Sequence, residues 1–239
     1  MHPRLSWSYV VFFAALTLLL VELHEQCHAI VTRLACGGWS SRVFDNVLPH
    51  AGCSPGRQAL VDIAGPLFSY TLLWIGALMF RQASSPHRAL GFTLAFASLP
   101  LARILPQVLT AFVAGSTSDE YGFLQRISGG AIERASAGTL ATVLALALAL
   151  PPLAILWRGL PAGRRGRWMS GFLLLPLVFV VLWSGVLNGA LAQGVLAQPL
   201  AAGLPVLLAI HAVAVAGLVF LLRGAPYRTA VRSATPSHS

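Results

Sequence analysis

The chain has 239 residues, of which 56% are hydrophobic and 10% charged, and its mean hydropathy is +0.75. This composition excludes a water-soluble monomer and a disordered chain, so the bilayer must be the main solvent. All 16 of its Lys and Arg residues are Arg, against 7 acids. Because the arginines are scattered between apolar runs, they indicate membrane-flanking charge and argue against nucleic acid as a partner.

Six stretches are long and apolar enough to cross a membrane as helices. They run over residues 8–34, 59–80, 89–113, 135–157, 168–192 and 200–222. The sequence therefore predicts an all-α integral membrane protein, a bundle of about six transmembrane helices. Residues 1–223 would form one membrane-embedded domain with its core at 8–130, and the polar tail 224–239 is expected to be disordered.

The longest connection, residues 35–58, follows the first predicted helix. Its β-branched and aromatic content at 39–48 lies between Gly37-Gly38 and Pro49. This pattern predicts a short hairpin or re-entrant loop near the membrane surface.

The end of the first stretch contains the pattern H-E-x-x-H, as His24-Glu25-Gln26-Cys27-His28. Histidines four residues apart lie on one helical face and can bind a single zinc ion, while Glu25 can activate zinc-bound water. In a chain of this composition chance produces the pattern only about 0.003 times. Charged residues in an apolar helix cost about 2.5–3.5 kcal/mol each, which favours a functional role over side chains that merely reach for the interface.

A catalytic zinc needs a third protein ligand and an open position. Asp119 and Glu120 follow the third stretch. If helices alternate in direction, the end of that stretch lies on the same side of the membrane as the end of the first, so Asp119 can meet His24 and His28. Asp119 also suits the start of a short helix, as its N-cap, and Glu120 is the second candidate for the ligand.

These motifs, with the loop and with Ala64-Gly65-Pro66-Leu67 near the start of the second stretch, resemble the site-2-protease family of intramembrane zinc metallopeptidases. The resemblance covers about residues 11–130. It implies that a single Zn²⁺ is bound by His24, His28 and an aspartate after the third core helix, here Asp119. It further implies that Glu25 is the general base and that Gly65 and Pro66 line the active site.

The sequence departs from the family pattern in two places. The Asn usual a few residues after Gly-Pro is replaced around Phe68-Ser69-Tyr70, and Asp119 is followed by Glu120 where Asp-Gly is common. The third ligand is thus the weakest part of the resemblance.

The resulting hypothesis is an enzyme, a zinc metalloendopeptidase that hydrolyses a peptide bond in or near a transmembrane segment of a membrane-protein substrate. One alternative is a non-proteolytic membrane zinc-binding protein or metal carrier that keeps the site. Another is a hydrolase that acts on lipid or isoprenoid within the bilayer. Cleavage of a helical peptide by the purified protein would separate these classes.

Several single residues carry weaker signals. Arg103 lies within the third stretch and should pair with an acid or face a water-filled cavity. Asp62 is a candidate to orient a motif histidine, and Cys27 is expected to pack rather than bind metal. Cys36 and Cys53 flank the loop and could pair in an oxidising compartment.

The arginines also bear on orientation in what is expected to be a bacterial-type cell membrane. With six spans, ten arginines fall on the side of the chain ends and five on the side of the long loop. The ten are Arg4, Arg81, Arg88, Arg158, Arg164, Arg165, Arg167, Arg223, Arg228 and Arg232, and the five are Arg33, Arg42, Arg57, Arg126 and Arg134. The positive-inside rule thus places the zinc site toward the outside, whereas the family resemblance implies a site near the cytoplasmic face.

Overall fold

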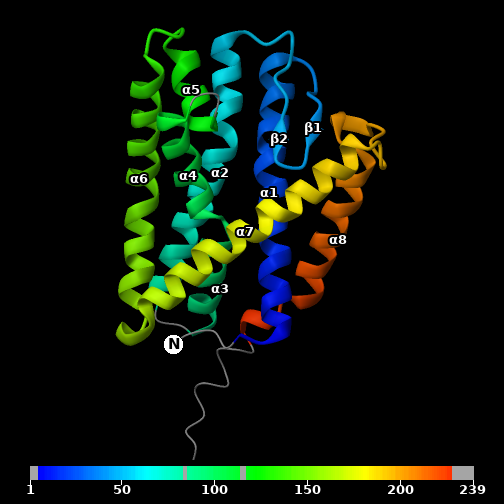
Figure 1. The fold of residues 1–239 in the computed structure, drawn as a ribbon. Helices are drawn as coiled ribbons and strands as arrows, with labels where there is room; N and C mark the ends of the chain where they lie inside the picture. Colours follow the sequence, from blue (N-terminus) through cyan, green and yellow to red (C-terminus); the bar gives the residue numbers. More distant parts are fainter. Residues whose placement is uncertain (1–4, 83–84, 114–116, 228–239) are drawn as a thin grey trace, which may run out of the picture.

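The computed structural model describes residues 5–82, 85–113 and 117–227, most of which are helical (Figure 1). Its elements in order are α1 Trp7–Cys36, β1 Arg42–Val43, β2 Asn46–Val47, α2 Pro55–Arg81, α3 Ser85–Ala97, α4 Pro100–Phe112, α5 Asp119–Ile127, α6 Arg134–Gly159, η1 Ala162–Arg164, α7 Arg165–Ala192, η2 Ala201–Gly203 and α8 Val206–Leu222. Six helical segments in these ranges are long and apolar enough to cross a membrane. The predicted all-α membrane bundle is confirmed, while the predicted tail lies outside the described residues from residue 228 onward.

Helix α1 is bounded by local signals that the sequence carries. The Ser6 hydroxyl accepts a hydrogen bond from the Tyr9 N–H at 3.3 Å, and Gly37 ends the helix with φ +83° while its N–H donates to the Arg33 carbonyl at 3.2 Å. A hydroxyl at the N-cap and a glycine in the left-handed region satisfy backbone groups that the helix itself leaves open. The apolar residues between them therefore form one continuous membrane-spanning helix.

The connection after α1 contains the predicted hairpin. Strands β1 and β2 pair antiparallel, with Arg42 opposite Val47 and Val43 opposite Asn46. The connection is shorter than the sequence suggested, because α1 continues to Cys36 and α2 already begins at Pro55, a residue favoured in the first helical turn. The hairpin is thus held between two helix ends.

The third predicted span is confirmed as one membrane-spanning segment, His87–Phe112, but the helix is interrupted between α3 and α4. Leu99 has φ +55°, and Pro100 follows it as the first residue of α4. Proline lacks the N–H that a continuous helix needs and disfavours helical geometry in the residue before it. Because of this break α4 begins at Pro100, and Arg103 lies in its first turn.

Small residues let the central helices approach closely. A Cβ placed on Gly76 of α2 would lie 2.5 Å from the Ala95 nitrogen of α3, and one on Gly138 of α6 would lie 2.6 Å from the Ala111 Cα of α4. Such contacts are a common way for helices to pack in lipid. Figure 1 shows α7 crossing one face of the bundle obliquely, with the hairpin and α5 toward the same end.

Candidate metal centre

The two motif histidines lie side by side on α1, facing α2. Their side chains are buried, with only 4% of His24 and 5% of His28 exposed, and their Nε2 atoms are 3.2 Å apart. The spacing of four residues accounts for this, since it brings both rings to the same face of the helix one turn apart. The sequence prediction that the two imidazoles converge is confirmed.

The outer nitrogen of each ring contacts α2. His24 Nδ1 lies 2.9 Å from Ser69 Oγ, and His28 Nδ1 lies 2.6 Å from the Val61 carbonyl oxygen. A carbonyl can only accept, so His28 Nδ1 carries a proton and its Nε2 is the nitrogen left to meet a cation. Contacts of this kind fix ring orientation in metal sites, and Ser69 and Val61 are partners that the sequence did not single out.

Gly65 makes room for the histidine pair. A Cβ on Gly65 would overlap both Nε2 atoms, standing only 2.5 Å from that of His24, so only glycine lets the α2 backbone come this close. Gly65 therefore lies against the candidate site, as the family resemblance implied. Pro66 is buried in α2 and lines neither of the two cavities described below.

Asp119 reaches the histidines from the start of α5. Its Oδ2 lies 3.4 Å from His24 Nε2 and 3.8 Å from His28 Nε2. Ser118 is the N-cap, so Asp119 occupies the first helical position rather than the cap expected as the alternative. Partial burial raises the pKa of the Asp119 carboxyl, but the imidazoles and the Arg103 guanidinium lower it by more, so it lies well below its usual value.

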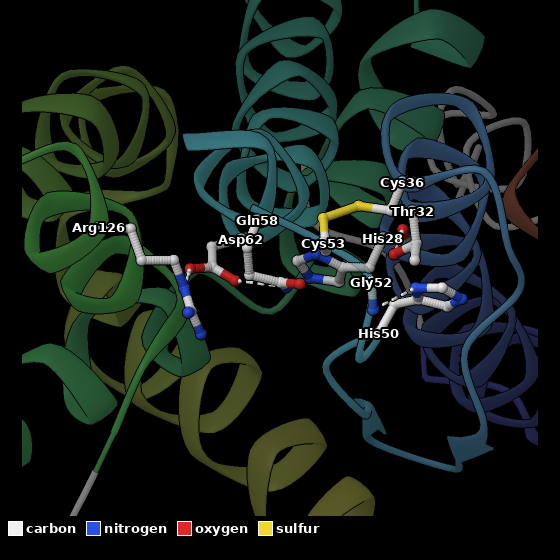
Figure 2. Close-up of a disulfide and its surroundings, with 9 residues drawn as sticks. All are labelled: His28, Thr32, Cys36, His50, Gly52, Cys53, Gln58, Asp62 and Arg126. Carbon is white, nitrogen blue, oxygen red and sulfur yellow. Dashed lines mark hydrogen bonds and ion pairs between the residues drawn. A yellow bond between two sulfur atoms is a disulfide. The ribbon is translucent and has the colours of Figure 1, made fainter. Parts of the chain in front are cut away.

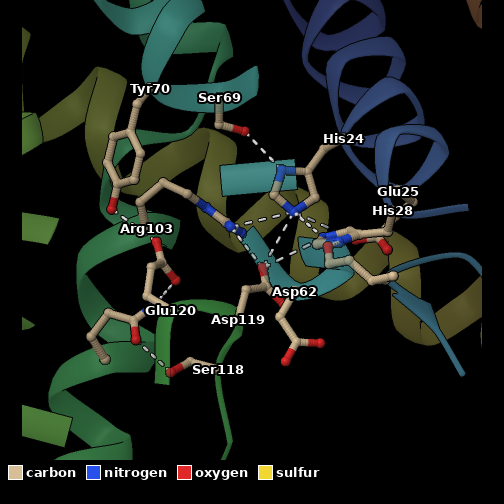
Figure 3. Close-up of polar contacts among 12 residues, drawn as sticks. His24, Glu25, His28, Asp62, Ser69, Tyr70, Arg103, Ser118, Asp119 and Glu120 are labelled. Carbon is tan, nitrogen blue, oxygen red and sulfur yellow. Dashed lines mark hydrogen bonds and ion pairs between the residues drawn. The ribbon is translucent and has the colours of Figure 1, made fainter. Parts of the chain in front are cut away.

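Glu120, the second candidate for the third ligand, points away from the histidines (Figure 3). It is fully buried, accepts a hydrogen bond from Tyr70 Oη at 2.9 Å and also accepts one from the Gln107 amide. Burial raises the pKa of its carboxyl above the usual value, although Arg103 lowers it. Glu120 thus anchors α5 to α2 and α4. This role follows from its buried contacts and could not be predicted from the neighbouring sequence.

A second anchor of α5 involves Asp62. Its Oδ2 lies 2.6 Å from Arg126 Nε, and its Oδ1 accepts a hydrogen bond from Gln58 Nε2 at 3.2 Å. Asp62 therefore does not orient a motif histidine, and that expectation is wrong. Asp62 instead pairs with Arg126 of α5, the helix that carries Asp119. It can therefore affect the site by positioning α5.

Two cavities meet beside the histidines. One of about 840 Å³ is lined mainly by polar side chains, among them Asp62, Gln107 and Asp119, and the other of about 410 Å³ is lined mainly by apolar ones from α1, α4 and α7. Glu25 and Arg103 line both cavities. Glu25 Oε1 lies 4.0 Å from His24 Nε2, and within the described ranges no protein group donates a hydrogen bond to its carboxylate. Glu25 is therefore free to bind a water molecule at the junction.

The three candidate ligand atoms fit a zinc ion. A tetrahedral ion with bonds of about 2.0–2.1 Å holds its ligand atoms about 3.3–3.4 Å apart. The three separations here are 3.2, 3.4 and 3.8 Å, and they need only small adjustments. Nitrogen and carboxylate donors suit zinc, and a set of two histidines and one carboxylate leaves a fourth position open, as catalytic sites require. His24, His28 and Asp119 could thus hold the ion, with Glu25 beside it as the third member of the buried His-Glu-His group.

Arg103 completes the cluster. Its Nη1 lies 3.0 Å from Asp119 Oδ2 and 3.3 Å from His24 Nε2 (Figure 3). Both possibilities raised from the sequence are realised, since Arg103 pairs with an acid and faces cavities. Because a guanidinium only donates, His24 Nε2 presents a lone pair to it, which places the proton of His24 on Nδ1, toward Ser69.

The hairpin is fixed over this region by a buried ion pair. Arg42 Nη2 lies 2.5 Å from Glu22 Oε2, and Arg42 Nη1 donates to Gln26 at 3.2 Å. Glu22 also contacts His211 Nδ1 of α8 at 3.1 Å, and the Phe44 N–H donates to Asn188 of α7 at 2.9 Å. These contacts hold the hairpin against α1 and α7, and Glu22 links the ion pair to α8.

A disulfide joins the two helices that carry the site. Cys36 and Cys53, whose pairing the sequence left open, are bonded with their Cα atoms 4.8 Å apart (Figure 2). Cys36 lies two turns beyond His28 on α1, and Cys53 comes just before α2. Cys27 is a free cysteine and is not part of the histidine cluster.

No protein-family model matches the chain, and no curated protein or solved structure matches it either.

Proposed function

We propose that this multi-pass membrane protein is a zinc metalloendopeptidase of the site-2-protease type, acting on a transmembrane segment of a membrane-protein substrate in a bacterial-type cell membrane. The observation that carries the proposal is the set of three ligand atoms at spacings close to those around zinc, next to Glu25, where a polar cavity meets an apolar one. The polar cavity can supply water, and the apolar one suits the side chains of a substrate helix.

Zinc bound by His24, His28 and Asp119 would supply a Lewis acid that polarises the scissile carbonyl and lowers the pKa of water toward about 7. Glu25 then removes the proton from the attacking water as the new C–O bond forms. The same carboxylic acid returns the proton to the amide nitrogen as the C–N bond breaks, so the leaving group departs as a neutral amine. Ser69 and the Val61 carbonyl keep the two imidazoles oriented throughout.

Zinc content and peptide cleavage, measured together on detergent-purified protein, test the proposal. We expect the wild type to hold one zinc and to cleave a helical transmembrane peptide. Glu25→Gln should keep the zinc but slow cleavage by about 10²–10⁴-fold, the usual contribution of a general base. His24→Ala and Asp119→Ala should lose both zinc and cleavage, whereas Glu120→Gln should keep the zinc.

Cys27→Ser is the matched control, because Cys27 lies between the motif histidines on α1 without belonging to the cluster. It should match the wild type in both measurements. Wild-type protein that binds zinc but cleaves no helical peptide would contradict the proposal. Metal flux into vesicles that depends on Glu25 would support the carrier instead.

A further inference from the structure

Arg103 is a partly buried cation, with 18% of its side chain exposed, and most of its hydrogen-bond donors are unused. A guanidinium offers five N–H donors, yet within the described ranges the hydrogen bonds of Arg103 go only to Asp119 Oδ2 and His24 Nε2, both through Nη1. None of its nitrogens belongs to the buried polar atoms left without a partner. Its remaining donors therefore face the cavities, and holding a charge inside a membrane-spanning segment is costly enough to call for a function.

The position of Arg103 relates it to the reacting bond. Arg103 and Glu25 both line the polar and the apolar cavity, so a peptide that lies across the junction of the two cavities would be near both side chains. Glu25 offers a proton acceptor there and Arg103 offers donors. Peptide hydrolysis needs both kinds of group. Glu25 can remove a proton from water, and Arg103 can stabilise negative charge on oxygen.

The present partners of Arg103 would not hold it once a metal ion is bound. His24 Nε2 can give its lone pair to a metal or to the guanidinium, but not to both. Asp119 Oδ2, the other partner, is also a candidate ligand atom. The negative charge that develops on oxygen in the transition state of hydrolysis would then give the guanidinium a new partner beside the ion.

We propose that Arg103 binds the carbonyl oxygen of the scissile peptide bond and stabilises the negative charge that develops on it. This inference rests on the proposed protease function. As the water oxygen bonds to the carbonyl carbon, the carbonyl π electrons move onto the oxygen that Arg103 holds, and Glu25 takes the water proton. When the C–N bond breaks, those electrons re-form the carbonyl and the proton passes from Glu25 to the nitrogen.

Arg103→Gln, compared with Arg103→Lys, tests this role. The glutamine variant should keep the wild-type zinc content and a KM within about threefold, while kcat falls about 10²–10³-fold, the usual loss of one oxyanion donor. Lysine, which keeps the charge but not the planar fork, should restore part of the rate. Arg158→Gln removes one exposed arginine elsewhere and should leave all these quantities unchanged.

Binding of a phosphinate peptide provides a readout besides cleavage. Its tetrahedral anion mimics the charged oxygen, so Arg103→Gln should weaken phosphinate binding by about the same factor as kcat/KM. Binding of the ordinary peptide to Glu25→Gln protein should hardly respond to the loss of Arg103. A role that is only structural, as the counter-ion of Asp119, predicts instead that zinc affinity falls.

The outcomes separate the two proposals. If the wild type cleaves and Arg103→Gln cleaves equally well, or loses zinc in proportion to activity, the role of Arg103 is overturned while the protease stands. If the wild type cleaves no peptide, both proposals fall.

Discussion

Gly65 shows how a single missing methyl group shapes the candidate site. The α2 backbone at this residue lies directly against the Nε2 atoms of His24 and His28. The same helix supplies Ser69 and the Val61 carbonyl, which contact the outer nitrogens of the two rings. Contacts with α2 therefore hold both histidine rings in place, and the distance between the rings depends on how closely α2 approaches α1.

Gly65→Ala should consequently reduce zinc affinity by at least tenfold, because the added Cβ must push α2 or the imidazoles apart. Gly56→Ala is its matched control in the same helix, since a Cβ at Gly56 meets nothing within 4 Å. The control should bind zinc normally and be as stable as the wild type or slightly more so. Competition with a chromophoric chelator measures both affinities, and equal values for the two variants would contradict the role given to Gly65.

At the scale of elements, the hairpin depends on a buried ion pair that links it to α1. Arg42 and Glu22 are 5% and 3% exposed, and they lie 2.5 Å apart. Removing one member of a buried pair leaves the other charged and unpaired, which usually costs about 3–5 kcal/mol, whereas replacing both costs much less. The pair should therefore behave as a unit.

Arg42→Met should destabilise the protein by about 3–5 kcal/mol, and the double variant with Glu22→Gln should recover much of that loss. The unfolding midpoint in mixed micelles with increasing SDS measures both effects. Ser41→Ala, on an exposed residue next to Arg42, is the control and should be neutral. Additive losses in the double variant would show that the two side chains act independently.

The elements differ in how far the sequence could predict them. The H-E-x-x-H pair and the six spans are local patterns, so their helices and the shared histidine face follow from spacing alone. The proximity of Asp119 to the histidines could be predicted only by assuming that successive helices alternate in direction. The break at Leu99 does not follow from the local sequence, because Pro100 also suits the interior of a lipid-embedded helix, where neighbouring groups can satisfy the freed backbone groups. Ser69, Tyr70 and Gln107 gain their roles only from tertiary contacts, which no local pattern encodes.

At the scale of the whole molecule, three features lie toward one end of the bundle. The disulfide, the hairpin and the polar cavity lie at the end where five of the flanking arginines are predicted, opposite the ten. Disulfides form and persist in oxidising compartments, and arginine-rich loops stay in the cytoplasm. These two independent indications agree on an outward-facing hairpin and disagree with the orientation that the family resemblance implies.

Labelling of intact cells with a membrane-impermeant maleimide checks the orientation, in a Cys27→Ser background. After reduction with an impermeant phosphine, Cys36 and Cys53 should react without permeabilisation. In protein whose Cys27, Cys36 and Cys53 are all replaced by serine, a cysteine at an exposed position of the basic connection, Gly163→Cys, should react only in permeabilised cells. Protein in which Cys36 and Cys53 are also replaced by serine gives the background labelling. The reverse labelling pattern would establish the opposite orientation.

The disulfide also bears on where a cleaved product would travel. It lies at the end of α1 nearest the histidines, which is also the end toward which the polar cavity lies. If the chain is the proposed protease and its hairpin faces outward, it would cut near the outer leaflet and leave the longer membrane anchor of its substrate on the cytoplasmic side. The freed fragment would then carry its signal away from the cell interior, as in the shedding of a surface protein.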